Sequence, residues 1–70
     1  MKYRVTYFYL ATGMEGVADE RDYGEVEASS SDEALNVVAE REIPVDEMYG
    51  PNKTYSSRQF FRGCLTAEEI

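Results

Sequence analysis

Histidine and tryptophan are absent from this sequence of 70 residues, and cysteine occurs once, as Cys64. A single cysteine excludes an internal disulfide, and a structural zinc ion would need about four Cys or His ligands. Histidine is also the side chain that most often transfers protons near neutral pH. No carboxylate pair stands in an apolar setting that would separate its pKa values, and no glycine-rich phosphate loop occurs. We therefore expect no enzymatic activity, no cofactor and no metal site.

Long apolar runs are also missing. The longest are far below the roughly 20 residues that a membrane-spanning helix needs. No N-terminal stretch combines a basic start, an apolar block and a small-residue cleavage site, as a signal peptide would. An unpaired cysteine fits a reducing compartment. The sequence therefore predicts a cytoplasmic protein that has no membrane partner.

The short chain limits the stability that a core can supply. We expect one domain, residues 1–70. A domain of this size buries only about 60% of the surface of its unfolded chain, and its core contributes no more than roughly 3–5 kcal/mol of net stability. With neither a disulfide nor a metal expected, a second copy of the chain or another protein is the remaining support. Both a homodimer and a complex with a different protein stay open.

Charge is distributed unevenly along the chain, whose formal net charge is −7. Residues 1–14 carry +2, residues 15–47 carry −10 and residues 48–70 carry +1. Coulomb repulsion between the acidic middle and phosphates makes direct DNA or RNA binding unfavourable. A protein partner with a basic surface is the expected alternative.

Two strands are predicted in the first half of the chain. Lys2–Leu10 is rich in Tyr, Val, Thr and Phe, and both of its faces become apolar toward the end, which is typical of a central strand. A second strand covers Tyr23–Ala28 and begins as early as Val17. Alternation places Val26 and Ala28 on its buried face, and Tyr23, Glu25 and Glu27 on its wet face.

A helix is predicted over residues 31–42. Ser30 and Glu33 have the spacing of a capping box, in which the serine caps the first turn. Leu35, Val38 and the neighbouring alanines supply an apolar stripe. Pro44 ends the helix at or before the preceding residue.

The last third of the chain predicts another strand. It covers Tyr55–Leu65, is strongest over Arg58–Cys64, and directs Phe60 and Phe61 to opposite faces. Thr66–Glu69 repeats the capping-box pattern and predicts a short terminal turn of helix. The predicted fold class is α+β: a β-β-α-β two-layer sandwich, with a three-stranded antiparallel sheet and one helix on one face. Its predicted core contains Val5, Tyr7, Tyr9, Val26, Ala28, Leu35, Val38 and either Phe60 or Phe61.

The segment Val26–Ala34, VEASSSDEA, is the most recognisable part of the sequence. A strand that ends in VEA, a serine cap and a helix that begins with DEA resemble small β-β-α-β proteins of phages and mobile elements. The DpnD/PcfM-like proteins and some type I anti-CRISPR inhibitors are similar, and Leu65–Ile70 resembles their ends. The resemblance covers about a third of the chain. It implies a fold rather than an activity, and it brings no catalytic motif.

Acidic residues form the first candidate sites. Glu15, Asp19, Glu20 and Asp22 lie in the predicted connection between the first two strands. They could hold a hard cation, occupy a basic groove of a partner in place of phosphates, or simply keep a small protein soluble. The second strand and the helix add Glu25, Glu27, Asp32, Glu33, Glu40, Glu42, Asp46 and Glu47. These side chains could merge with the connection into one negative flank, or form an ordinary polar exterior.

Aromatic and apolar residues form the second set of candidates. Tyr23, Tyr49 and Tyr55 are the preferred contact residues, because tyrosine buries much area at little entropic cost. Phe8 and Leu10, with Phe60 or Phe61, are expected on the face of the sheet that points away from the helix. A second copy could cover this apolar patch, and so could a loop or the terminal turn.

Two functional hypotheses follow. In the first, the protein is a small acidic interaction module of a phage or mobile element, which inhibits a nucleic-acid-binding machine by occupying its basic surface. The partner-binding residues would be Glu15, Asp19, Glu20, Asp22, Tyr23, Glu25, Glu27, Glu40, Tyr49 and Tyr55. In the second, it is a bacterial accessory or structural protein that dimerises through Phe8 and Leu10, and its acids serve only solubility.

Overall fold

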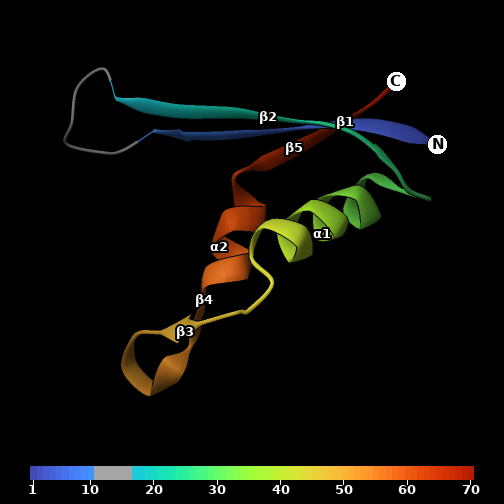
Figure 1. Ribbon diagram of the computed structural model, residues 1–70. Coiled ribbons are helices and arrows are strands. Elements are labelled where there is room, and N and C mark those ends of the chain that lie inside the picture. The colour runs from blue at the N-terminus through green and yellow to red at the C-terminus, as the bar shows by residue number, and fades with distance from the viewer. Residues whose placement is uncertain (11–16) are drawn as a thin grey trace.

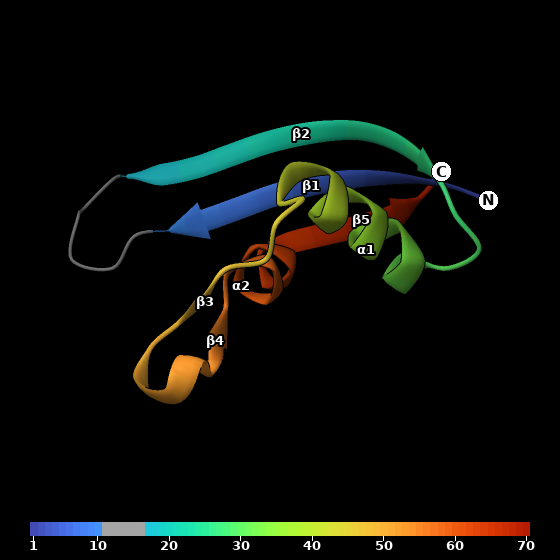
Figure 2. The same cartoon turned by 60° about the horizontal axis from the view of Figure 1, so that its bottom comes forward.

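A computed structural model describes residues 1–10 and 17–70 and shows an α+β fold (Figure 1). A three-stranded antiparallel sheet has the order β2-β1-β5, with β1 at Lys2–Leu10, β2 at Ala18–Glu27 and β5 at Leu65–Glu69. The helices α1, Ser31–Glu42, and α2, Ser57–Gly63, both lie on one side of it (Figure 2). The fold class and the antiparallel sheet are confirmed, but the described chain has two α-helices where one was predicted.

Between the helices, the chain forms a small hairpin. It contains β3, Met48–Tyr49, the 3-10 turn η1, Pro51–Lys53, and β4, Tyr55–Ser56. This hairpin and the β1–β2 ribbon both extend beyond the helix layer (Figure 1). The molecule measures 38 × 32 × 15 Å. Such a thin shape leaves a large share of the chain at the surface.

β1 is the central strand, as predicted. Tyr3, Val5 and Tyr7 are buried beneath the helices, whereas the residues between them are exposed. This alternation follows from the pleat, which directs successive side chains to opposite faces. Tyr9 continues the inner row but lies beyond most of the helix layer and remains 38% exposed, so its predicted place in the core is wrong.

β2 contains a bulge that changes which face its residues occupy. Glu25 pairs with Arg4 and Asp22 pairs with Thr6, so two residues of β2 stand opposite the single Val5. Gly24 has φ +78°, a conformation that glycine adopts without steric cost. The extra residue brings Tyr23 to the inner face, where its ring meets Phe61 edge-on at 5.9 Å. The prediction that Tyr23 shares the wet face with Glu25 and Glu27 is therefore wrong.

α1 forms where it was predicted. The side chain of Ser30 accepts a hydrogen bond from the backbone N–H of Glu33 at 3.2 Å, which satisfies one unpaired donor of the first turn. Ala34, Val38 and Ala39 are buried against the sheet. The helix ends one residue before Ile43, which precedes Pro44.

The predicted strand Tyr55–Leu65 is wrong, because α2 occupies most of it. Ser56 accepts a hydrogen bond from the N–H of Gln59 at 3.1 Å, and Asp46 accepts one from the N–H of Arg58 at 3.0 Å. Ser56 and Gln59 themselves have the capping-box spacing, a signal that the β-favouring residues around them concealed. Tertiary contacts of Asp46 complete the cap.

The third strand is β5, where a terminal turn of helix was predicted. Thr66–Glu69 pairs with Tyr3–Thr6 of β1 in an antiparallel ladder. The inward residues of β5, Leu65 and Ala67, join the core. Capping-box spacing was misleading here, because pairing with a central strand satisfies the backbone of this short segment better than one isolated turn.

Phe61 closes the core, whereas Phe60 does not enter it. Both residues lie on α2, so their predicted places on opposite faces of a strand are wrong. The ring of Phe61 stacks on Tyr7 at a centroid distance of 5.2 Å. Phe60 is 43% exposed and contacts the rings of Tyr9 and Tyr55. Neither phenylalanine reaches the sheet face that bears Phe8.

Candidate functional site: the outer face of the sheet

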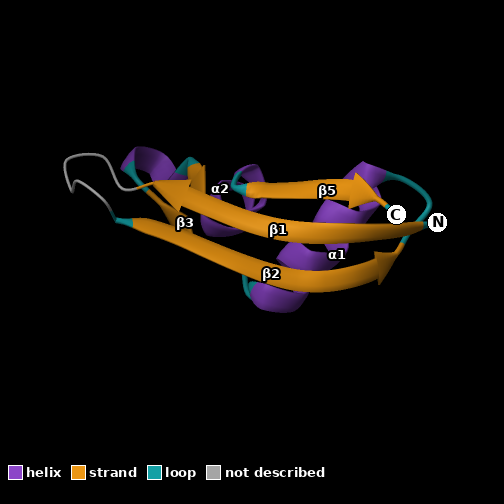
Figure 3. Cartoon of the chain, turned by 90° about the horizontal axis from the view of Figure 1, so that it is seen from above, coloured by secondary structure: helices purple, strands orange, loops and turns teal. Residues whose placement is uncertain are grey.

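The side of the sheet that points away from α1 and α2 is here called the outer face. Figure 3 looks onto it and shows the described helices behind the strands. The pairing register identifies the side chains that share it. From β1 these are Lys2, Arg4, Thr6, Phe8 and Leu10; from β2, Ala18, Glu20, Asp22, Glu25 and Glu27; and from β5, Thr66 and Glu68.

Four carboxylates on β2 form one row along this face. The carboxylate row consists of Glu20, Asp22, Glu25 and Glu27, all of them exposed. Neighbours two residues apart on a strand lie about 7 Å apart. With Glu68 on β5, the outer face has five acidic side chains against the basic Lys2 and Arg4. The face is therefore negatively charged.

Arg4 lies at the centre of these charges. Its Nη2 is 3.1 Å from Oδ2 of Asp22, and the pairing register puts Glu25 on one side of it and Glu68 on the other. The backbone N–H of Gly24 donates to Oδ1 of Asp22 at 2.9 Å. This hydrogen bond, assisted by Arg4, lowers the pKa of Asp22, so its carboxylate is ionised and fixed in orientation.

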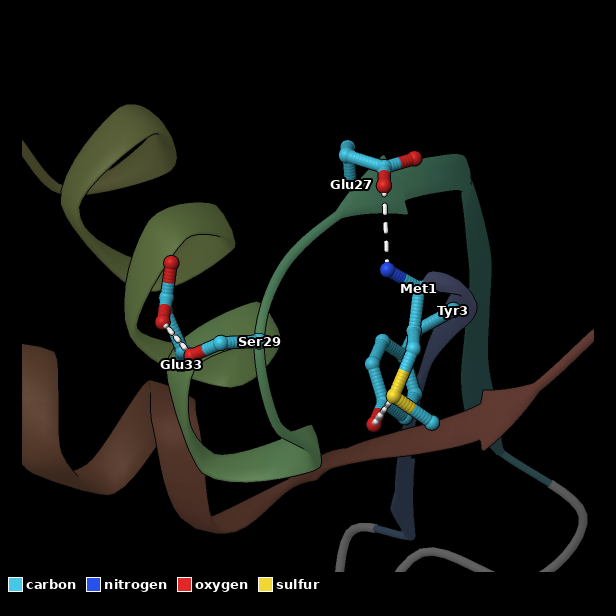
Figure 4. Close-up of polar contacts among 5 residues, drawn as sticks. All are labelled: Met1, Tyr3, Glu27, Ser29 and Glu33. Atoms are coloured by element: carbon cyan, nitrogen blue, oxygen red, sulfur yellow. Dashed lines mark hydrogen bonds and ion pairs between the residues drawn. The ribbon is translucent and has the colours of Figure 1, made fainter.

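The amino terminus partly neutralises the far end of the row. Its nitrogen is 3.0 Å from Oε1 of Glu27, and the hydroxyl of Tyr3 points to the sulfur of Met1 (Figure 4). Within residues 1–10 and 17–70, Glu20 and Glu25 form no ion pair. These two carboxylates are the members of the row that remain available to an external cation.

Apolar side chains continue the outer face toward the tip of the ribbon. Phe8 is 53% exposed and Leu10 is 54% exposed. A shallow depression of about 440 Å³ lies beside Phe8 and is also lined by Glu20 and Asp22. An aromatic ring flanked by carboxylates suits the stem and charged head of an Arg or Lys side chain.

Asp19 and Tyr23, although predicted as contact residues, lie on the inner side of β2. Asp19 accepts from Arg21 at 2.8 Å, and this hydrogen bond raises the pKa of the arginine. The Arg21 guanidinium also lies 5.3 Å from the centre of the Tyr7 ring and donates to the hydroxyl of Tyr23. Both predicted residues therefore have partners within the fold. Neither side chain belongs to the outer face.

The remaining predicted residues are scattered. Glu40 lines a polar groove between α1 and α2, together with Arg58 and Arg62. Tyr49 and Tyr55 pair in the β3–β4 hairpin, which is separate from the outer face. Glu15 lies outside the described residues. Of the ten predicted partner-binding residues, the outer face brings together the four of the carboxylate row.

Two groupings of surface residues were not predicted. Strand pairing brings Glu68 beside Arg4 on the outer face and so connects residues at opposite ends of the chain. Tyr9, Phe60 and Tyr55 form an exposed aromatic group, with centroid distances of 5.6 and 5.9 Å between successive rings. The alternation of Lys2–Leu10 is enough to place Arg4 on the face of Phe8 and Leu10. The position of Glu68 depends on the strand β5, and the aromatic group depends on the helix that replaced the predicted strand.

In the part of the chain that the structure describes, no three potential metal ligands lie close enough together to bind an ion. The same residues include no helix with the length and hydrophobicity required to cross a membrane. Comparisons with protein-family models, with curated proteins and with solved structures give no match for this chain.

Proposed function

We propose that the protein is a non-enzymatic interaction module that binds a basic protein surface through the outer face of its sheet. The observation that carries the proposal is the carboxylate row, which lies on a sheet face that neither helix covers. The inhibitory form of the proposal is that the row occupies cationic residues with which a nucleic-acid-binding machine would otherwise hold phosphates.

Electrostatics supports this assignment in two ways. A negative face attracts a basic partner over a Debye length and raises the association rate. After contact, Glu20 and Glu25 can pair with Arg or Lys without first breaking an ion pair of the described fold. Competition with nucleic acid follows, because the partner's cations cannot serve carboxylates and phosphates simultaneously.

Charge reversal tests the proposal. The protein is used to capture partners from host lysate, and the captured material is assayed for nucleic-acid binding with and without the protein. Glu20→Lys combined with Glu25→Lys should abolish both capture and inhibition. Glu40→Lys combined with Glu42→Lys changes the net charge by the same amount, but on the helix layer. This control variant should leave capture and inhibition intact. Equal behaviour of the two double variants would remove the proposal.

A second candidate function, homodimerisation, is favoured by one observation: Phe8 and Leu10 are exposed together on the ribbon. In this alternative, the chain is an accessory protein whose sheet packs against a second copy. Sedimentation at micromolar concentration should then show a dimer that Phe8→Glu separates. Val45→Glu provides the control, because Val45 is 72% exposed and lies on a distant loop. A monomer at every concentration would exclude this alternative.

A further inference from the structure

The free edge of β2 offers a second recognition element beside the carboxylate row. β2 bonds to β1 and is the outermost strand on its side of the described sheet (Figure 3). A strand at an edge presents backbone N–H and C=O groups that an additional strand can pair with. The edge of β2 is ten residues long, and its partner strand β1 contributes Tyr3, Val5 and Tyr7 to the core.

The pairing pattern determines which residues of β2 present these groups outward. The N–H of Phe8 donates to the carbonyl of Cys64, so the even-numbered residues of β1 face β5 and its odd-numbered residues face β2. Tyr7 and Tyr9 therefore bond to Arg21 and Asp19. The backbone groups of the alternate residues, Ala18, Glu20 and Asp22, point to the free edge.

The same residues thus combine outward backbone groups with outer-face carboxylates. A residue of an added strand that pairs with Glu20 or Asp22 would carry its side chain on the outer face, beside the carboxylate. The bulge at Gly24 interrupts the regular edge, which makes Ala18–Asp22 the continuous docking segment. The edge and the row form one surface.

We propose that a basic, extended segment of a partner protein adds to the edge of β2 as a further strand, with Lys or Arg at alternate positions facing the carboxylate row. This inference rests on the proposed function and names the form that its partner takes. Charge selects the occupant, because β2 strands from two copies would bring acidic residues opposite one another and repel. A strand with alternating cations would instead be attracted, and main-chain bonds would add affinity.

Backbone methylation of a peptide separates edge pairing from simple charge attraction. The probe is a synthetic peptide that alternates Lys with Val, and its affinity for the full chain is measured by fluorescence anisotropy at low salt. One derivative is N-methylated at every Lys and the other at every Val. Only one set of N–H groups faces β2, so one derivative should bind at least about tenfold more weakly and the other should bind almost unchanged. A peptide of the same composition with its lysines in one block serves as the control, and it should bind more weakly than the alternating peptide.

The outcomes distinguish failure of the edge-pairing proposal from failure of the proposed binding through the outer face. One outcome is that both methylated peptides bind as well as the parent while Glu20→Gln lowers the affinity of all three peptides. In that case binding through the outer face is retained as a proposal and edge pairing is overturned. If the parent peptide does not bind, or if Glu20→Gln combined with Glu25→Gln does not change its affinity, the proposed function is overturned as well. Self-association through β2, seen as a concentration-dependent dimer that high salt strengthens, would overturn the choice of a basic occupant.

Discussion

At the scale of single residues, Arg4 limits the negative charge of the outer face. It is paired with Asp22 and faces Glu25 and Glu68 across the two neighbouring strands. Because both members of the ion pair are more than half exposed, the pair contributes little to folding. Its main effect is on recognition, since it holds one carboxylate of the row away from an external cation.

Arg4→Gln should therefore strengthen binding of the alternating peptide by several-fold and change the free energy of unfolding by no more than about 1 kcal/mol. The affinity is measured at several salt concentrations, and the gain should shrink as salt rises. Arg62→Gln provides the control, because Arg62 pairs with Asp32 on the helix layer and its loss changes the net charge equally. An unchanged or weaker affinity for Arg4→Gln would contradict the role given to Arg4.

Asp46 is a residue whose charge supports the fold rather than recognition. Hydrogen bonds from the hydroxyl of Ser56 and the N–H of Arg58 lower its pKa. A lowered pKa in the folded state means that the ionised carboxylate stabilises the fold above the unfolded-state pKa of about 3.9. This stabilisation is lost as the pH falls through the lower, folded-state pKa.

We expect Asp46→Asn to lower the melting temperature at pH 6 and to have a much smaller effect at a pH below the folded-state pKa of Asp46. Thermal unfolding of both proteins across this range, followed by circular dichroism, measures the difference. Glu40→Gln, which removes an exposed carboxylate from α1, should show little pH-dependent difference. A constant difference between wild type and Asp46→Asn at all pH values would contradict the assignment.

At the scale of secondary-structure elements, the bulge in β2 organises both faces of the sheet. It turns Tyr23 toward Phe61 while it leaves Glu25 beside Arg4 on the outer face. Gly24 permits this arrangement through its positive φ. The positions of the core and of the carboxylate row thus depend on one backbone conformation.

Gly24→Ala should destabilise the protein by about 1–2 kcal/mol because an alanine pays a steric cost in the left-handed region. A Cβ at this position would meet no atom within 4 Å, so the cost comes from the backbone alone. Gly63→Ala is the matched control: a Cβ there also meets nothing within 4 Å, and its φ is not positive, so alanine should preserve or increase stability. Chemical denaturation of both variants tests this contrast.

At the scale of the whole molecule, stability depends on a thin core that a few large side chains fill. Phe61 reaches this core from α2 and contacts Tyr7 and Tyr23, so it links the second helix to two strands. The core of a domain of this length supplies no more than roughly 3–5 kcal/mol of net stability. Loss of one such ring is therefore comparable with the stability of the whole fold.

Phe61→Ala should cost about 3–5 kcal/mol and leave the chain largely unfolded at 25 °C. Phe60→Ala, one position earlier on the same helix, should cost less than about 1.5 kcal/mol, because that ring is partly exposed. Urea denaturation gives both values. Similar losses for the two variants would contradict the division of α2 into a core side and an exposed side.

Local chemistry in the sequence was sufficient to locate two elements. The alternation of Lys2–Leu10 identified a central strand, and the serine cap and Pro44 delimited α1. Two further elements were misassigned, because Tyr and Phe favour strands while a Thr-x-x-Glu spacing favours a helix start. In α2 and β5, contacts with Asp46 and β1 outweighed these preferences.

The acidic character of the chain was determined by the sequence alone, because charge is a sum over residues and needs no fold. Which acids act together was decided by the tertiary structure. Strand pairing and the bulge at Gly24 gathered the carboxylate row on one face, whereas Asp19 and Glu40 went to other surfaces. The physical reason is that a shift of one residue in a strand moves a side chain to the opposite face. Local sequence patterns do not determine that register, which depends on how distant strands pair.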